Sequence, residues 1–304
     1  MGTVCIAEGA GHDTTLVAAA LGSALVEIGR LEKIMTPWDS LSELRLLNKR
    51  AGSTLAVTPD LFAVVDSSLA FARMTHGAFD PTVEPLVEAW DLRGQGRVPS
   101  DDELSDARSK VGWQLVDIGP STKTIFCGVI GYGIDLGGIG KGYALDRAAA
   151  VLHFKSIFRA RLNFGGELYV CSDGAPWLIA IANPTKRLEP AVRFSLGTGA
   201  VSTSGQSEHG FERNGVRYGH VLDPNTGRPV DTRASVTVVA ASGTRADALS
   251  TGLLVMGRER AQKFAELHPE IGVLWLEPAN NGVQAWKWHF PAGATLESGV
   301  RWMN

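Results

Sequence analysis

Helical and strand-like segments follow one another along this chain without a strict alternation, and this order constrains the fold most. Apolar residues recur at three- and four-residue steps from about Asp13 to Met35 and again from Thr58 to His76, which predicts two long helices. Beyond residue 113 the pattern changes to short strand-like runs separated by turns. A doubly wound parallel sheet would need regular alternation, so the order favours an α+β fold with mixed or antiparallel sheets and packed helices.

Further elements are predicted from the same patterns. Helices are expected at Val83–Trp90, Ala144–Phe154, Ala246–Met256 and Arg258–Leu267. Strands are expected at Trp113–Ile118, Thr124–Val129, Arg161–Asn163, Leu168–Cys171, Trp177–Ile181, Ala191–Leu196, around Val201, and at Tyr218–Leu222 and Ser235–Ala240. A closing hairpin is expected from Gly272–Trp275 and Val283–Phe290. The polar stretch Asp91–Lys110 is expected to be an exposed excursion.

Composition is that of an ordinary globular protein. The 304 residues, of which 44% are hydrophobic and 20% charged, suffice for one large domain or for two intimately packed halves. A formal net charge of -3 provides no long-range attraction to nucleic acid or to an anionic membrane. We therefore expect the partners of this chain to be recognised at a specific site and not to include nucleic acid.

The cysteines and the N-terminal sequence bear on the cellular compartment. Cys5, Cys127 and Cys171 are too few and too scattered for a disulfide framework or a zinc site, so we interpret them as buried thiols. No apolar leader follows Met1 in the sequence as written. We also expect no membrane span, because none of the apolar stretches approaches about 18 to 20 residues. These observations predict a cytoplasmic protein.

Glycine is clustered, most densely in Asp135-Leu136-Gly137-Gly138-Ile139-Gly140-Lys141-Gly142-Tyr143. This run lies between a predicted strand and a predicted helix, where glycines let the backbone approach a ligand and the helix start attracts phosphate. Lys141 adds a positive charge. The spacing is neither that of a P-loop nor that of the Rossmann motif, so a tight turn with a solvent-facing lysine remains the alternative.

A second candidate site is formed by Asp247 and Thr251. Four residues separate them, so they share one face of the predicted helix. A carboxylate and a hydroxyl together suit magnesium or another hard cation. Two ligands do not complete a metal site, however, and an aspartate near a helix start beside an unrelated threonine explains the pair more simply.

Two further clusters contain candidate proton carriers and hydroxyl groups. His220 precedes the turn sequence Asp-Pro-Asn-Thr-Gly and could carry a proton near neutral pH, although a lone histidine is more often structural. The segment Ser202–His209 could hydrogen-bond a ligand or merely form a loop. A serine hydrolase that uses Ser204 and His220 is disfavoured, because the Gly-x-Ser-x-Gly elbow is absent.

Taken together and in this order, the clusters resemble the ApbE family of FAD:protein FMN transferases. The resemblance begins at Met1-Gly2-Thr3 and continues through Met35–Trp38, Ser42–Leu44, Leu47-Asn48 and Gly77–Thr82 into the clusters above. It implies a tandem T-fold-like α+β architecture, with residues 1–304 forming a single flavin transferase domain of the ApbE type.

The resemblance also implies which residues bind FAD. Met1 and Trp38 would flank the flavin or adenine rings, and Trp38 stands where many members of the family have tyrosine. The other FAD-binding residues that it implies are Ala78, Phe79, Asp80, Gly137, Lys141, Tyr143 and Leu222.

The resemblance further implies a metal and a reaction. A divalent cation, expected to be Mg²⁺ with Mn²⁺ or Ca²⁺ as alternatives, would be held by the backbone carbonyl of Gly140 and the side chains of Asp247 and Thr251. Ser250 stands where some members have a second aspartate. His220 is similar to the histidine proposed as general base in the family.

The reaction implied is the transfer of FMN from FAD to a serine or threonine of an acceptor flavoprotein, with release of AMP. Two alternatives remain open at this point. One is a metal-dependent FAD pyrophosphatase that yields FMN and AMP, and the other is a non-catalytic flavin-binding assembly factor.

Overall fold

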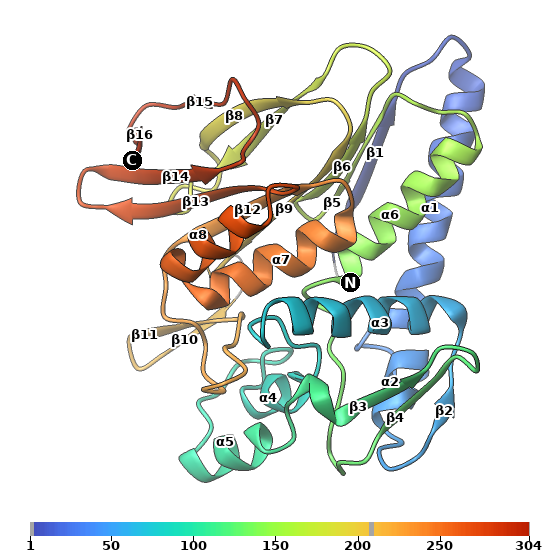
Figure 1. Cartoon of the computed structure of the whole chain (residues 1–304), viewed down its shortest axis with the longest axis vertical. Helices are drawn as coiled ribbons and strands as arrows, with labels where there is room; N and C mark the ends of the chain where they lie inside the picture. Colours follow the sequence, from blue (N-terminus) through green and yellow to red (C-terminus); the bar gives the residue numbers. More distant parts are fainter. Residues whose placement is uncertain (1–2, 207–209, 304) are drawn as a thin grey trace. The chain divides into compact units, whose positions relative to one another are not determined.

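The computed structural model describes residues 3–206 and 210–303, and the chain divides into two compact units (Figure 1). Unit 1 comprises Leu31–Gly140 and Gln206–Thr232, and unit 2 comprises the described residues of Gly2–Arg30, Lys141–Gly205 and Arg233–Asn304. Each unit is therefore assembled from segments that are distant in the sequence.

An eight-stranded sheet is the main element of unit 2. Its strand order is β1-β5-β6-β9-β12-β13-β14-β16, and all neighbouring strands are antiparallel except β14 and β16, which are parallel. The strands are β1 (Cys5–Gly9), β5 (Ala160–Phe164), β6 (Glu167–Cys171), β9 (Gly199–Gly205), β12 (Ser235–Ala240), β13 (Gly272–Ala279), β14 (Gly282–Trp288) and β16 (Val300–Trp302). A mixed, mainly antiparallel sheet with packed helices confirms the predicted α+β class.

The core of unit 2 is formed where helix α7 (Gly243–Met256) and a second, smaller sheet pack against the eight-stranded sheet. Helix α7 packs against β9 and β12. A second, three-stranded sheet of β7 (Trp177–Ala182), β8 (Pro190–Leu196) and β15 (Thr295–Leu296) shares an apolar cluster with the large sheet. Every residue of β12 is buried, so both of its faces are covered. The result is a rigid, largely apolar support beneath α7.

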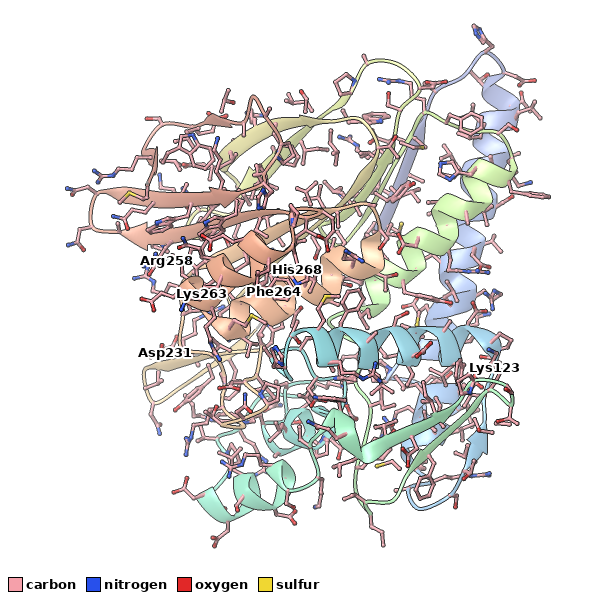
Figure 2. All side chains as sticks on the ribbon, viewed as in Figure 1. Lys123, Asp231, Arg258, Lys263, Phe264 and His268 are labelled. Atoms are coloured by element: carbon pink, nitrogen blue, oxygen red, sulfur yellow. The ribbon has the colours of Figure 1, made fainter. Side chains whose placement is uncertain are left out.

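Helix α8 (Arg258–Leu267) is amphipathic (Figure 2). Phe264 is buried and Lys263 is exposed. The ring of His268, which ends the helix, lies 4.2 Å from the ring of Phe264, and the guanidinium of Arg258 lies 4.4 Å from the ring of Trp286. The Arg258–Trp286 contact joins α8 to β14, and the His268–Phe264 contact packs the end of the helix on itself.

Helix α1 (Thr14–Met35) confirms the first predicted helix, and α6 (Gly140–Phe154) begins at Gly140 instead of Ala144. Asp13 caps α1 by accepting N–H bonds from Thr15 and Leu16. Contrary to the sequence expectation, α1 is long and apolar enough to cross a membrane. Core helices of soluble proteins and signal sequences meet the same criterion, so this does not establish a membrane span.

Unit 1 is built from the long helix α3, three short helices and two small sheets, counted over its described residues. The helices are α2 (Glu43–Asn48), α3 (Pro59–Met74), α4 (Glu84–Ala89) and α5 (Asp101–Arg108), and the strands are β2 (Leu55–Ala56), β3 (Val116–Gly119), β4 (Thr124–Cys127), β10 (Gly210–Arg213) and β11 (Val216–Gly219). Thr58 caps the start of α3, and Gly77, at φ 80°, closes its end with an N–H bond to the carbonyl of Ala72, as predicted.

Some sequence expectations are wrong. The stretch from Asp91 to Lys110 is not simply an exposed excursion, because it contains α5, whose residues Leu104 and Ala107 are buried in an apolar cluster with Trp90. Helix α5 begins with a capping box formed by Ser100 and Glu103.

Two further expectations need correction. The predicted strand Trp113–Ile118 starts as a turn of 3₁₀ helix, Trp113–Leu115, and only then continues as β3. Cys127 and Cys171 are buried as predicted, whereas Cys5 is only half-buried.

Candidate functional site

Asp247 lies in the interior of unit 2, on the second turn of α7, and is 2% exposed. Its Oδ2 accepts a 2.9 Å hydrogen bond from the backbone N–H of Gly142, and its carboxylate also accepts from the N–H of Lys141. Both N–H groups belong to the first turn of α6, where helical N–H groups have no partner within the helix. Burial raises the pKa of Asp247, while the charge of Lys141 and the two N–H bonds oppose this shift.

The same two helices are joined by a second aspartate, Asp146. Its Oδ1 accepts from the N–H of Gly243 at 2.5 Å, and its Oδ2 accepts from the N–H of Thr244 at 2.9 Å. The backbones approach so closely that a Cβ atom on Gly142 would lie 2.1 Å from the carbonyl oxygen of Gly243. Glycine is therefore required at position 142 by packing, independently of any ligand.

A row of hydroxyl groups extends from Asp247 along α7 and β9. Thr251 Oγ1 lies 3.2 Å from Ser204 Oγ, which lies 2.8 Å from Ser250 Oγ. Ser250 Oγ also lies 3.1 Å from Ser202 Oγ and donates to the carbonyl oxygen of Asp247 at 3.0 Å. Ser250 thus belongs to a network of hydroxyl groups from α7 and β9.

Lys141 and Glu167 form an ion pair at the end of this hydroxyl row. Lys141 Nζ lies 3.3 Å from Glu167 Oε1, and the same oxygen accepts from Ser202 Oγ at 3.3 Å. Lys141 is therefore half-buried and ion-paired in unit 2, not a lysine that faces only solvent.

Oxygen ligands of the kind that hard cations prefer are available in this region. Asp247 supplies a carboxylate and Thr251 a hydroxyl on the same face of α7, while Gly140, the first residue of α6, directly precedes Lys141. Within residues 3–206 and 210–303 there is no group of three or more His, Cys, Asp or Glu side chains that could hold a metal. A mixed set of one carboxylate, one hydroxyl and one carbonyl fits Mg²⁺, which retains several waters, better than it fits Zn²⁺.

The segment Ala78–Thr82 in unit 1 is organised by Asp80, which is 8% exposed. Asp80 Oδ1 accepts from Thr82 Oγ1 at 2.6 Å and from the N–H of Thr82 at 2.9 Å, and Oδ2 accepts from the N–H of Trp113 at 3.0 Å. Burial raises the pKa of Asp80, and these hydrogen bonds oppose the shift. The carboxylate therefore fixes the local backbone, and Ala78 and Phe79 are buried beside it.

The glycine-rich turn lies against this segment within unit 1. The N–H of Asp135 donates to the carbonyl oxygen of Pro81 at 2.7 Å, and the N–H of Gly137 donates to Asp135 Oδ1 at 2.6 Å. The side chain of Asn48 brackets Ile134 with two hydrogen bonds of 2.8 and 2.9 Å. Two motifs of the ApbE resemblance, Leu47-Asn48 and Gly77–Thr82, are thereby explained as supports of the turn.

The remaining predicted FAD-binding residues differ in exposure. The ring of Trp38 is 63% exposed, as a stacking surface would be. Tyr143 is 8% exposed, and Leu222 is 6% exposed within the apolar cluster around Trp90. Met1 lies outside the described residues. The assignment of all these residues to FAD stays a prediction.

His220 lies directly after β11 and is half-buried. The next residue, Val221, is held by the side chain of Gln206: its N–H donates to Gln206 Oε1 at 3.0 Å, and its carbonyl accepts from Gln206 Nε2 at 2.7 Å. Before the histidine, Tyr218 packs with its ring 5.4 Å from that of Trp90. The backbone on both sides of His220 is thus fixed.

Three residues that hydrogen-bond to the candidate site segments have no role assigned from the sequence: Asp146, Gln206 and Arg93, which donates to Asp135. Arg93 and Asp146 are charged residues in polar surroundings, and their partners are 42 and 97 residues away in the chain. Gln206 lies in the serine-rich segment, but no pattern separates it from the residues beside it. No local sequence signal identifies any of the three.

Comparison with known proteins gives one consistent result. The sequence pattern of the ApbE family matches residues 1–275. A protein of Vibrio cholerae serotype O1 described as FAD:protein FMN transferase is 35% identical over 257 residues, which cover 82% of this chain and 76% of that protein. A protein of Klebsiella pneumoniae with the same description is 29% identical over 298 residues, which cover 94% of this chain and 85% of that protein.

Solved structures share the fold. A histidine-to-glycine mutant of the flavin transferase ApbE from Vibrio cholerae matches with a TM-score of 0.81 at 32% identity, covering 95% of this chain and 94% of that chain. The apo form of the Pseudomonas stutzeri flavinyl transferase ApbE matches with a TM-score of 0.81 at 29% identity, covering 94% of each chain. The likeness therefore extends over almost the whole length of both.

Proposed function

This chain belongs to the ApbE family, and from that premise we propose that it transfers the FMN half of FAD to a serine or threonine hydroxyl of an acceptor protein in a metal-dependent reaction. Its relatives at 29 to 35% identity are FAD:protein FMN transferases, so the chain is an enzyme of flavin transfer. To this family activity we add two proposals: that the reaction depends on a metal, and that the acceptor group is a serine or threonine hydroxyl. AMP is the leaving product.

Asp247 carries the metal part of the proposal. It is a carboxylate with almost no exposure to solvent, and Thr251 follows one helical turn later. Burying a carboxylate is costly unless charge or hydrogen bonds compensate it, and Asp247 is compensated by two N–H groups and by Lys141. A cation bound by Asp247, Thr251 and the carbonyl of Gly140 would add to that compensation.

Each residue has a distinct role in the proposal. A bound Mg²⁺ would supply positive charge to the pyrophosphate of FAD. Lys141, held by Glu167, adds a second positive charge in unit 2. His220 accepts the proton of the acceptor hydroxyl as that oxygen attacks the FMN phosphorus. Gln206 and the packing of Tyr218 fix the backbone from which His220 extends.

The proposed FAD contacts are those that the family resemblance implies. They are Met1, Trp38, Ala78, Phe79, Asp80, Gly137, Lys141, Tyr143 and Leu222. The exposed ring of Trp38 supports stacking, and the exposed backbone of Gly137 supports close approach of a phosphate.

The test is a flavinylation assay. The protein is incubated with FAD, magnesium and candidate acceptor proteins, and covalent flavin fluorescence is followed on a denaturing gel. The proposal predicts a fluorescent acceptor band that requires the metal and disappears when EDTA is added. An acceptor whose flavin-modified residue is neither serine nor threonine, or labelling that persists in EDTA, would contradict it.

A matched pair of variants tests whether His220 is the general base. His220→Ala should retain FAD binding and lose transfer, whereas His153→Ala, at a histidine on α6 that has no part in the proposal, should transfer normally. Normal flavinylation by His220→Ala would remove the role assigned to His220.

A further inference from the structure

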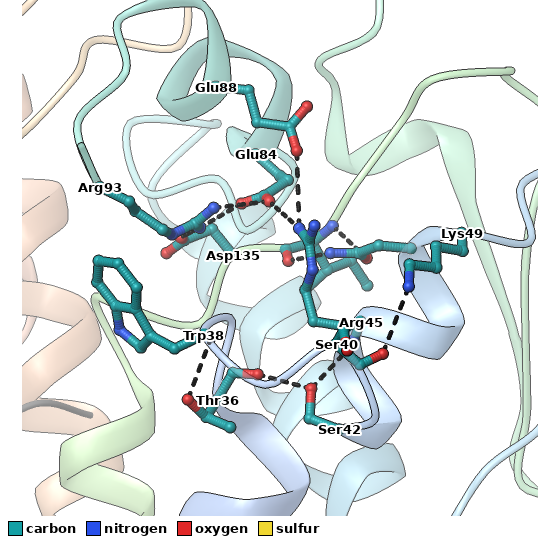
Figure 3. A network of polar contacts seen from close by, with 12 residues as sticks. Thr36, Trp38, Ser40, Ser42, Arg45, Lys49, Glu84, Glu88, Arg93 and Asp135 are labelled. Atoms are coloured by element: carbon teal, nitrogen blue, oxygen red, sulfur yellow. Dashed lines mark hydrogen bonds and ion pairs between the residues drawn. The ribbon is translucent and has the colours of Figure 1, made fainter. Parts of the chain in front are cut away.

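Arg93 joins two carboxylates of unit 1 (Figure 3). Its Nη1 donates to Glu84 Oε1 at 2.7 Å, and its Nη2 donates both to Glu84 Oε2 and to Asp135 Oδ2. The guanidinium thus makes a two-pronged contact with Glu84 while it also binds Asp135. The three side chains are 20%, 4% and 18% exposed for Arg93, Glu84 and Asp135, so solvent screens this contact only weakly.

The loop that presents Arg93 is itself ordered. After α4, Asp91 adopts φ 50°, and its carbonyl oxygen accepts from the N–H groups of Gly94 at 3.0 Å and Gly96 at 3.1 Å. The N–H of Arg97 then returns to the carbonyl oxygen of Trp90 at 2.9 Å. This closed turn fixes the backbone around Arg93, so little backbone freedom remains to be lost when the contact forms.

Asp135 passes this constraint to the glycine-rich turn. While its Oδ2 accepts from Arg93, its Oδ1 accepts from the N–H of Gly137 at 2.6 Å. The turn continues with an N–H bond of 2.7 Å from Gly140 to the carbonyl oxygen of Leu136. Arg93 therefore determines where the carboxylate points, and the carboxylate determines where the N–H of Gly137 points.

The second carboxylate explains why an arginine is needed. Glu84 is 3% exposed and is also contacted by Arg45 at 3.1 Å. Gly133 leaves room for it, because a Cβ atom there would lie 2.6 Å from Glu84 Cγ. Lysine is a compact ammonium without a planar fork and cannot make the two-pronged contact with Glu84 while it binds Asp135, whereas arginine does both.

We propose that Arg93 is a positioning residue for FAD: by holding Asp135, whose other oxygen binds the N–H of Gly137, it fixes the conformation of the turn 135–140 that the phosphates of the ligand would contact. This inference rests on the proposed function, because it takes the turn 135–140 as part of the FAD site. Arg93 does not touch the ligand in this arrangement and acts through Asp135.

A purely structural role for Arg93 makes a different prediction. Loss of a buried ion pair that only stabilises the fold would lower the melting temperature and leave the FAD affinity of the folded protein unchanged. A positioning role changes FAD affinity and amide exchange in the turn beyond any change in melting temperature.

The experiment compares Arg93→Met, Asp135→Asn, the double variant and Arg93→Lys, each as the full-length chain. Arg97→Met is the matched control, because Arg97 lies in the same segment and pairs with Glu103 at 2.8 Å on an exposed surface. FAD dissociation constants are measured by flavin fluorescence, and kcat is measured at saturating FAD. Amide hydrogen exchange is carried out on the full-length protein and read from the proteolytic fragment that covers residues 132–140.

We expect Arg93→Met and Asp135→Asn each to weaken FAD binding about tenfold or more, which is about 1.4 kcal/mol. The double variant should be no weaker than the worse single variant, because both remove the same contact. Exchange in the turn should accelerate, kcat at saturating FAD should fall less than threefold, and Arg93→Lys should recover part of the affinity. Arg97→Met should bind FAD within twofold of the wild type.

The inference is overturned if Arg93→Met, folded by its melting transition, binds FAD within twofold of the wild type or shows unchanged exchange in the turn. If Arg93→Met does not fold, the same criteria apply to Asp135→Asn and Arg93→Lys. Wild-type protein that binds no FAD would overturn the proposed function together with the inference, whereas wild-type binding with unaffected variants overturns only the inference.

Discussion

Asp146 and Asp247 each cap the helix that carries the other. Asp146, on α6, accepts from the first N–H groups of α7, and Asp247, on α7, accepts from the first N–H groups of α6. The two helix starts are thereby fixed relative to each other within unit 2. The carboxylate that we propose as a metal ligand is consequently held in place before any ligand binds.

The close crossing of these helices predicts the effect of a methyl group at Gly142. Gly142→Ala would place a Cβ atom 2.1 Å from the carbonyl oxygen of Gly243 and 2.8 Å from Asp247 Cβ, so the helices must separate. We expect the free energy of unfolding to fall by about 1 to 3 kcal/mol or more, measured by urea denaturation.

Gly22→Ala is the control for this measurement. Gly22 is exposed on α1 and has open space at its Cβ position, so alanine there should leave stability unchanged or raise it by up to about 1 kcal/mol. Equal stabilities of the two alanine variants would contradict the packing argument.

Asp247→Asn should separate folding from metal binding. The amide can still accept the N–H bond of Gly142, so the melting temperature should change little, while loss of the negative charge removes the strongest proposed metal ligand. Magnesium affinity, measured by calorimetry in the presence of FAD, should fall more than about 100-fold. Loss of a residue that only hydrogen-bonds to a metal ligand lowers affinity less, by about 10- to 100-fold. Asp66→Asn, at an exposed site on α3, should bind magnesium as the wild type does. Unchanged magnesium affinity in Asp247→Asn would refute its role as a ligand.

Gln206→Met tests whether the backbone next to His220 must be fixed. The substitution removes three hydrogen bonds of 2.7, 3.0 and 3.0 Å to Val221 and Val230. The N–H of Val221 loses its acceptor, whereas the carbonyl oxygens of Val221 and Val230 keep the N–H bonds from Val230 and Thr232. We expect a loss of about 1 to 3 kcal/mol in stability and a fall in kcat larger than any change in FAD affinity. Gln262→Met serves as the control, because Gln262 lies on α8 and its side chain donates to Glu266 at 2.9 Å. A folded Gln206→Met enzyme with wild-type kcat would contradict this account.

The capping box of α5 predicts a pH dependence. The hydrogen bond from Arg97 and the N–H of Ser100 lower the pKa of Glu103 to about 2, below its usual value of 4.5. A depressed carboxylate pKa contributes stability above pH 4.5, and this contribution is lost as the pH falls toward 2. The melting temperature of Glu103→Gln should therefore lie slightly below that of the wild type at pH 7, and the difference should shrink in acid. A difference that is independent of pH would rule out this linkage.

The sequence predicts this structure best where its signals are local. α1 follows from apolar spacing and ends before Pro37, and α3 follows from Thr58 and Gly77. The start of α6 is missed because Gly140 and Gly142 are poor helix formers, and the helix is completed by a cap from Asp247, 105 residues away from Gly142.

Pairing between distant segments also limits what the sequence predicts elsewhere. Strand β1 is not predicted, because it is short and pairs with β5, in which Phe164 lies opposite Cys5 but far from it in the sequence. In the candidate site, Asp247 and Thr251 are recognisable because helical spacing relates them. Arg93 is not recognisable, because Glu84 and Asp135 become its neighbours only after folding.

The central claim is that FMN passes from FAD to a protein hydroxyl and not to water. The most direct measurement is the ratio of AMP released to flavin bound covalently to the acceptor, determined with and without acceptor in the presence of FAD and magnesium. The account predicts one AMP for each bound FMN and no AMP release without acceptor. AMP release at an equal rate without acceptor, with no protein-bound flavin, would contradict it and identify an FAD pyrophosphatase.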